Sequence, residues 1–276
     1  MTTVPSSNNS PAQWWKQNRK AILPPIFGIG GFLLFWQLSS SLGLTKLAGP
    51  LSLWTDERTR ELLLYPFFDN GGLDKGLFHH SMSSLSRVAI GYSLAAVIGI
   101  AIGIAVGLNK GLNRAFDPLF QFLRMVAPLA WVPIALVMFQ QNQPAAIFVI
   151  FITAVWPIVI NTAVGINEIP QDYTNVARVL RLRKRSYLGD ILMPATAPYV
   201  FTGLRIAIGL AWLAIVAAEM LKADGGIGFF IWDAYNAGGD TSTSQIILAI
   251  VVIGLVGLAL DRLVGAIGTL VARGGK

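Results

Sequence analysis

Cysteine is absent from this 276-residue chain, which excludes disulfides, thiolate metal sites and thiol nucleophiles. Charged residues are also scarce. They make up 13% of the chain, whereas soluble domains carry about 25%. Apolar residues reach 54%, and the mean hydropathy is +0.60. This balance indicates a polytopic membrane protein.

Signatures of catalysis are missing as well. No G-x-x-x-x-G-K-[ST] stretch occurs, so the chain has no P-loop to bind ATP. The two histidines, His79 and His80, are adjacent, and adjacent side chains do not converge on a metal ion. Only Glu219 lies within a predicted span, so no carboxylate cluster suggests hydrolysis. We expect no catalytic residue, metal site or cofactor in this chain, and no enzyme activity.

Long apolar stretches organise the rest of the sequence. A spanning helix needs about 20 mostly apolar residues, and six stretches meet this requirement. They are residues 21–42, 87–108, 118–139, 145–166, 199–221 and a last stretch that starts near Ser244. The sequence therefore predicts an all-α integral membrane protein with six transmembrane helices over residues 21–272, an outer loop at 43–86 and a polar cytoplasmic tail at 1–20.

The distribution of basic residues predicts the orientation. If the N-terminus is cytoplasmic, thirteen Lys and Arg residues lie on the cytoplasmic side and five on the outer side. Cytoplasmic loops of membrane proteins carry such an excess. The formal charge of +7 therefore needs no nucleic-acid partner. We expect both termini in the cytoplasm and residues 167–198 to form a cytoplasmic loop.

Two of the predicted spans carry packing signals. In the second span, small residues recur every four positions, which lets helix backbones approach closely in lipid. These residues are Gly91, Ala95, Gly99, Gly103 and Gly107. The third span contains Pro128 and Pro133, and prolines interrupt the backbone hydrogen bonds of a helix. Such irregular backbone either lines a cavity or is a packing kink.

Two arginines, Arg124 and Arg205, lie well inside the predicted spans. Each is about seven residues from the cytoplasmic end of its helix, or roughly 10 Å. An intramembrane charge usually faces the bundle interior or a watery cavity, where it could attract a permeating anion. Alternatively, each arginine extends to the interface or pairs with a carboxylate. Trp131 and Trp156 are weaker candidates for the same path.

A basic, helix-prone segment, "NVARVLRLRKRSYLGDILMP", lies in the loop between spans four and five. Pro170 precedes it and Pro194 ends it. It predicts either a helix on the membrane surface or a docking surface for a cytoplasmic partner.

This segment resembles the pattern E-A-A-x3-G-x9-I-x-L-P in the permease subunits of bacterial ABC importers. Asn175 replaces the Glu, Arg181 the Gly and Met193 the Leu, while the spacing is kept. The resemblance implies a loop that couples the permease to its ATPase. The implied coupling residues are Asn175, Val176, Ala177, Arg178, Arg181, Ile191, Met193 and Pro194.

Other blocks resemble the nitrate, bicarbonate, taurine and aliphatic sulfonate permeases, above all the cyanobacterial nitrate/nitrite branch. They include "DPLFQFLRMVAPLAWVPIALVMF", "EIPQDYTNVARVLRL" and "GGIGFFIWDAYN". The resemblance implies the type I importer permease fold, a permease homodimer in the bacterial inner membrane and an external substrate-binding protein. It also implies two cytoplasmic ATPase subunits that hold ATP-Mg.

The resemblance implies nitrate or nitrite as the substrate, with bicarbonate or an organic sulfonate as alternatives. A secondary anion transporter or channel is a more remote alternative. Such a protein would carry inverted repeats and embedded coupling charges, and the sequence shows no convincing repeat.

Overall fold

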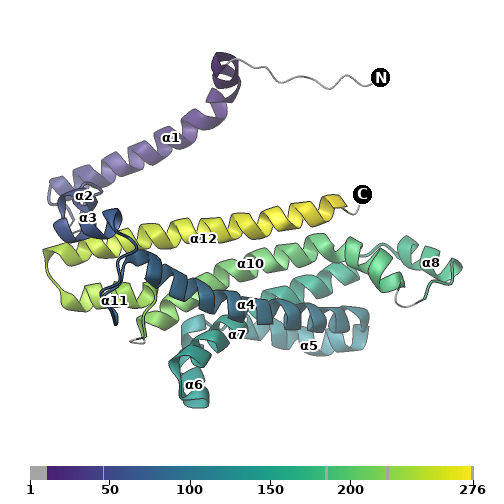
Figure 1. Ribbon diagram of the computed structural model, residues 1–276. Coiled ribbons are helices and arrows are strands. Elements are labelled where there is room, and N and C mark those ends of the chain that lie inside the picture. The colour runs from purple at the N-terminus through teal and green to yellow at the C-terminus, as the bar shows by residue number, and fades with distance from the viewer. Residues whose placement is uncertain (1–10, 46, 184–185, 222–223, 275–276) are drawn as a thin grey trace.

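The computed structural model describes residues 11–45, 47–183, 186–221 and 224–274, and these are helical apart from turns, loops and one short bridge (Figure 1). Five helices contain segments long and apolar enough to cross a membrane. They are α1 (Pro11–Ser41), α4 (Leu77–Leu108), α7 (Asn142–Asn167), α10 (Met193–Met220) and α12 (Asp240–Gly274).

Two further helices, α5 (Lys110–Leu123) and α6 (Pro128–Phe139), are together long and apolar enough to cross a membrane but meet at 96°, as in a broken span or a re-entrant loop. The bend precedes Pro128, and Ala127 before it has ψ 135°, outside the helical range, as a residue before proline prefers. The span predicted over residues 118–139 is therefore divided at this bend, where the sequence predicted an irregular backbone. Six spans result when the bent pair is counted as one.

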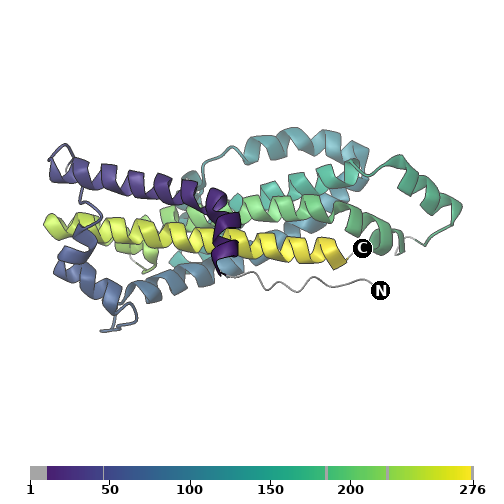
Figure 2. The same ribbon diagram turned by 90° about the horizontal axis from the view of Figure 1, so that it is seen from above.

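Helix α7 forms the centre of the bundle, between α4 and α10 (Figures 1 and 2). The small residues of α4 let the two backbones approach, as the sequence predicts. A Cβ atom added at Gly103 would lie 2.5 Å from the Cβ of Thr162 on α7. Gly91, Gly99 and Gly107 are similarly close to α7 side chains. On the other side of α10, the Trp212 indole N–H donates to the Ile253 carbonyl of α12 at 3.0 Å.

Helix α1 stands apart from the others (Figure 1). Only 6% of its most apolar window is buried within the chain. The connection that follows it contains the short helices α2 (Ser52–Thr55) and α3 (Glu57–Leu64). Leu62 of α3 packs with Leu77 and Leu248 in a small core, so the outer-loop segment rests on α4 and α12.

The hairpin between α3 and α4 is held by ion pairs on the surface. Lys75 lies 2.9 Å from Asp69, and this partner holds the pKa of the Asp69 carboxyl below its usual range. Arg58 contacts Glu61 at 3.0 Å and Asp74 at 3.1 Å. The pKa of Asp74 is lowered as well, first by the hydrogen bond from Asn70 and also by Arg58.

Helix α4 begins at Leu77, ten residues before the predicted start of the span at Arg87. His79 and His80, expected in the loop, therefore lie in its first turn. The hydropathy of this turn is low because it contains two histidines, and His80 is accommodated because its Nδ1 accepts a hydrogen bond from the Gly226 N–H at 3.3 Å.

Candidate coupling segment and membrane charges

The predicted coupling segment contains two helical pieces, at the end of the bundle that we name the α8 end. Helix α8 (Gln171–Val179) follows α7, and a π-helical turn, η1 (Tyr187–Leu192), leads into α10 (Figure 1). Local π-helix is rare and is often found at functional sites. The irregular turn is continuous with α10, which begins at Met193.

Arg181 has the left-handed backbone angle φ 49°. Helix α8 ends at Val179, two residues before Arg181. The Leu182 N–H donates to the Ala177 carbonyl at 3.0 Å. This bond closes a Schellman motif, in which the left-handed position is usually glycine. The family pattern has glycine at this position, so the geometry explains the residue that Arg181 replaces.

The remaining coupling candidates differ in exposure. Ala177 is already buried within the isolated chain, and Ile191 is half-buried. The exposed candidates are Asn175, Arg181, Met193 and Pro194. The side chains of Val176 and Arg178 lie outside the described residues.

Arg124 lies at the bend between α5 and α6. It is the C-cap of α5, and its N–H donates to the Phe120 carbonyl at 3.0 Å. Its side chain is exposed and has no ion pair among the described residues. The guanidinium is therefore free to meet an anion or solvent.

Arg205 adopts one of the alternatives left open by the sequence, because it pairs with a carboxylate. Its Nε and Nη2 atoms each lie 2.6 Å from an oxygen of Asp261 on α12. The pair borders a groove of about 610 Å³ between α10 and α12. Asp261 thus balances the charge of Arg205, which weakens a direct role in attracting anions.

The two tryptophan candidates pack in separate places. Trp131 packs against a small core that contains Val132 and Ala214. Trp156 stacks on Phe120, with ring centroids 5.8 Å apart, and its indole N–H has no partner among the described residues. No hydrogen bond, ion pair or ring contact within the described ranges joins any two of Arg124, Arg205 and these tryptophans.

A buried ion pair lies at the opposite, or α11, end of the bundle. Arg87 Nη1 of α4 is 2.7 Å from Glu219 Oε1 of α10, and both residues are buried. The same guanidinium donates to the carbonyls of Asp224 at 2.9 Å and Gly225 at 3.2 Å. Arg87 therefore connects α4, α10 and the loop after α10.

The other oxygen of Glu219 is satisfied as well. It accepts from the Ser84 hydroxyl at 2.7 Å and the Gly228 N–H at 3.1 Å. Ser84 in turn accepts from the Ile227 N–H at 2.9 Å. Gly226, with φ 102°, has no room for a side chain, because a Cβ would lie 2.2 Å from the carboxyl carbon of Glu219. These contacts fix the start of α11 (Ile227–Ala237).

Sequence reasoning missed this cluster. It placed Arg87 at the edge of a span and noted Glu219 alone. The available signal was an intramembrane acid followed by the glycine-rich "GGIG", a loop that can approach a buried side chain closely.

Comparison with known proteins agrees with this architecture. The family model "Binding-protein-dependent transport system inner membrane component" matches residues 95–272. The chain belongs to this family. Its members are ABC importer permeases, so this chain is a multi-pass permease subunit that works with ATPase and substrate-binding partners.

Three curated relatives cover most of this permease. The bicarbonate transport system permease protein CmpB of Synechococcus elongatus is 64% identical over 91% of the chain and 89% of the relative. CmpB of Synechocystis sp. is 61% identical over 99% of both. The nitrate import permease protein NrtB of Synechococcus elongatus is 58% identical over 99% of the chain and 98% of the relative.

A solved structure shares the fold of the permease. A chain of the MetNI methionine ABC transporter in its inward-facing conformation superposes with a TM-score of 0.57 at 19% identity. The match covers 69% of this chain and 95% of that one. The expected type I importer permease fold is thereby confirmed.

Proposed function

We propose that this permease carries a small inorganic oxyanion, with nitrate or nitrite as the first candidate. The observation that supports this proposal is the 58% identity to a nitrate import permease over almost the whole chain. Bicarbonate is the second candidate. The permeases named for bicarbonate are 61–64% identical, so overall identity supports bicarbonate at least as well. Nitrate stands first on the resemblance of the sequence blocks to the nitrate/nitrite branch. Both candidates are small monoanions, so a permease that presents few fixed cations could pass either.

We infer that two copies of the chain form the path in the bacterial inner membrane, with both termini in the cytoplasm. Two ATPase subunits would hold ATP-Mg and dock on the segment from Asn175 to Pro194, while the permease itself hydrolyses nothing. The absence of a P-loop from the sequence supports this division of labour. On this proposal the α8 end is cytoplasmic and the α11 end faces the binding protein.

Within the path, we assign the attraction of anions to Arg124 rather than Arg205. The Arg124 guanidinium is exposed and unpaired among the described residues, whereas Arg205 is balanced by Asp261. An attraction of this kind must remain weak enough to release the anion. Trp131 and Trp156 are proposed as packing elements beside the path.

Anion-stimulated ATP hydrolysis tests the substrate. The permease is reconstituted with its ATPases and binding protein, and nitrate, nitrite, bicarbonate and taurine are added one at a time. Nitrate or nitrite should stimulate hydrolysis at the lowest concentration. Stimulation by bicarbonate alone would select the second candidate, and stimulation by taurine alone would contradict the assignment to inorganic oxyanions.

A further inference from the structure

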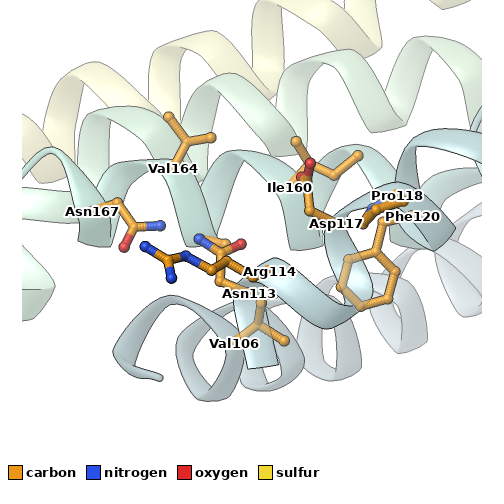
Figure 3. A pocket seen from close by; sticks show the side chains of 10 residues that line it. Val106, Asn113, Arg114, Asp117, Pro118, Phe120, Ile160, Val164 and Asn167 are labelled. Atoms are coloured by element: carbon orange, nitrogen blue, oxygen red, sulfur yellow. The ribbon is translucent and has the colours of Figure 1, made fainter. Parts of the chain in front are cut away.

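A cavity of about 440 Å³ lies between the first turns of α5 and the last turns of α7 (Figure 3). Three nitrogen-bearing side chains line it: Asn113 and Arg114 of α5, and Asn167, which ends α7. In Figure 3 the guanidinium of Arg114 and both amides lie at one end of the cavity. Hydrogen-bond donors from two helices therefore face one space at the α8 end.

The charge of Arg114 has no balancing ion pair within the part of the chain that the structure describes. Arg87 and Arg205 each contact a carboxylate, but Arg114 has no ion pair among the residues that the structure describes. One carboxylate, Asp117, also lines the cavity. Figure 3 shows it toward Ile160 and away from the Arg114 guanidinium, and its Oδ1 accepts from Gln121 at 3.5 Å.

Apolar side chains form the rest of the cavity wall. Phe120 is buried and stacks on Trp156, while Ile160 and Val164 of α7 line the same space. Hydrogen bonds from a cation to an anion are stronger beside such a wall than in bulk water.

We propose that Arg114, Asn113 and Asn167 form a binding site for a small oxyanion. A guanidinium offers parallel N–H groups that match two oxygens of a planar or tetrahedral oxyanion. The amide of Asn113 adds donors from the same helix and the amide of Asn167 adds donors from α7. The cavity has room for such an anion with some of its water. The same chemistry would suit a free anion or the phosphate of a lipid headgroup.

The position of this oxyanion site suggests what occupancy does. Asn167 is followed after three residues by α8, the candidate coupling helix. An anion held between α5 and Asn167 would tie the base of α8 to α5. With the proposed function and orientation, the imported anion would then restrain the coupling segment from the cytoplasmic side as it accumulates. This regulatory consequence rests on the proposed function, whereas binding itself does not.

Calorimetric titration of the assembled permease–ATPase complex in detergent tests the site, with nitrate, bicarbonate and inorganic phosphate as probes. Arg114→Gln should weaken binding of at least one probe about tenfold, as expected for loss of a charge-assisted contact. Asn167→Ala should weaken it in the same direction. Lys110→Gln is the matched control, because Lys110 is a basic residue one turn earlier that does not line the cavity.

A second arm identifies the source of the anion. Phospholipid that copurifies with the wild-type complex is measured by mass spectrometry. Its loss in Arg114→Gln, with no free-anion binding in the wild type, would support the site and assign it to a lipid phosphate. Equal anion binding and equal retained lipid in the wild type, Arg114→Gln and Asn167→Ala would overturn the proposal. Because phosphate serves as a probe, this result is independent of which anion is transported.

Discussion

At the scale of single residues, we expect the buried pair of Arg87 and Glu219 to matter most for the stability of the folded permease. Its two members come from α4 and α10. Arg87 also bonds to the loop before α11, and Glu219 also bonds to the first turn of α11. Removal of one partner leaves the other as an unpaired buried charge, which typically costs about 3–5 kcal/mol.

We therefore expect Arg87→Leu to lower the unfolding temperature of the purified permease strongly. Arg58→Leu is the control, since Arg58 pairs with two carboxylates on the surface and its side chain is 44% exposed. Exposed pairs contribute little, so the control should unfold close to wild type. Equal unfolding temperatures for both variants in a thermal scan would show that the buried cluster is not a stabilising element.

Arg181 offers a prediction of the opposite sign. A non-glycine residue in the left-handed region costs about 1 kcal/mol, so Arg181→Gly should stabilise the turn after α8. Arg183→Gly at a position without positive φ should instead loosen the same segment. Hydrogen exchange of the Leu182 amide, which donates to Ala177, measures the difference. Faster exchange in Arg181→Gly than in wild type would contradict the Schellman assignment.

At the scale of elements, the contact between α4 and α7 depends on the absence of side chains. Gly103→Leu would push against the Cβ of Thr162, and overpacking of this kind costs about 1–3 kcal/mol or more. Gly254→Leu on α12 is the control, because nothing lies within 4 Å of an added Cβ there. In thermal unfolding of the purified chain, Gly103→Leu should have a lower unfolding temperature than Gly254→Leu. No difference between them would mean that α4 and α7 are not in close contact.

The coupling segment gives the second prediction at this scale. Ala177→Asp would place a charge at a buried position of α8, and an unpaired buried charge costs several kcal/mol. We expect the complex either to lose its ATPase subunits or to hydrolyse ATP without transport. Asn175→Asp adds the same charge at an exposed position of the same helix and should change less. Size-exclusion chromatography and coupled ATPase assays distinguish these outcomes. Normal transport by Ala177→Asp would mean that Ala177 is not at a packed contact in the assembled complex.

Hydropathy located the five long apolar helices because lipid demands long apolar stretches. It failed where contacts with other parts of the chain replace contacts with lipid or water. The start of α4 was missed because His80 and Ser84 bond to the start of α11, more than 140 residues away. The partner of Arg205 was unknown because Asp261 lies on another helix. The sequence predicted an interruption near Pro128 but not the angle of the bend, because proline breaks the helical hydrogen bonds without fixing the direction of the next helix.

At the scale of the whole molecule, the described chain has incomplete packing. Helix α1 contacts little of the chain, and α12 exposes a row of apolar side chains. Lipid, partner subunits or both must cover these surfaces, because exposed apolar patches of this extent are unusual for a protein in water. These surfaces agree with a chain embedded in lipid and with a family whose permeases work with partners.

The anion path supplies the prediction at this scale. Arg124→Gln and Arg205→Gln are made separately in the assembled complex. Arg124→Gln should lower transport with basal ATP hydrolysis retained, whereas Arg205→Gln should change transport less because Asp261 already balances the charge of Arg205. Wild-type transport rates for Arg124→Gln across a range of anion concentrations would remove Arg124 from the path.

The central claim is that this chain is the membrane path of an ATP-driven oxyanion importer. The most direct measurement is uptake of isotopically labelled nitrate, nitrite and bicarbonate by liposomes that contain the permease, its ATPases and the binding protein. We predict uptake of at least one of these anions against its gradient, dependent on ATP and abolished when the ATPases are left out. Gradient-driven uptake by the permease alone, unchanged by ATP, would contradict the account and favour a secondary transporter or channel.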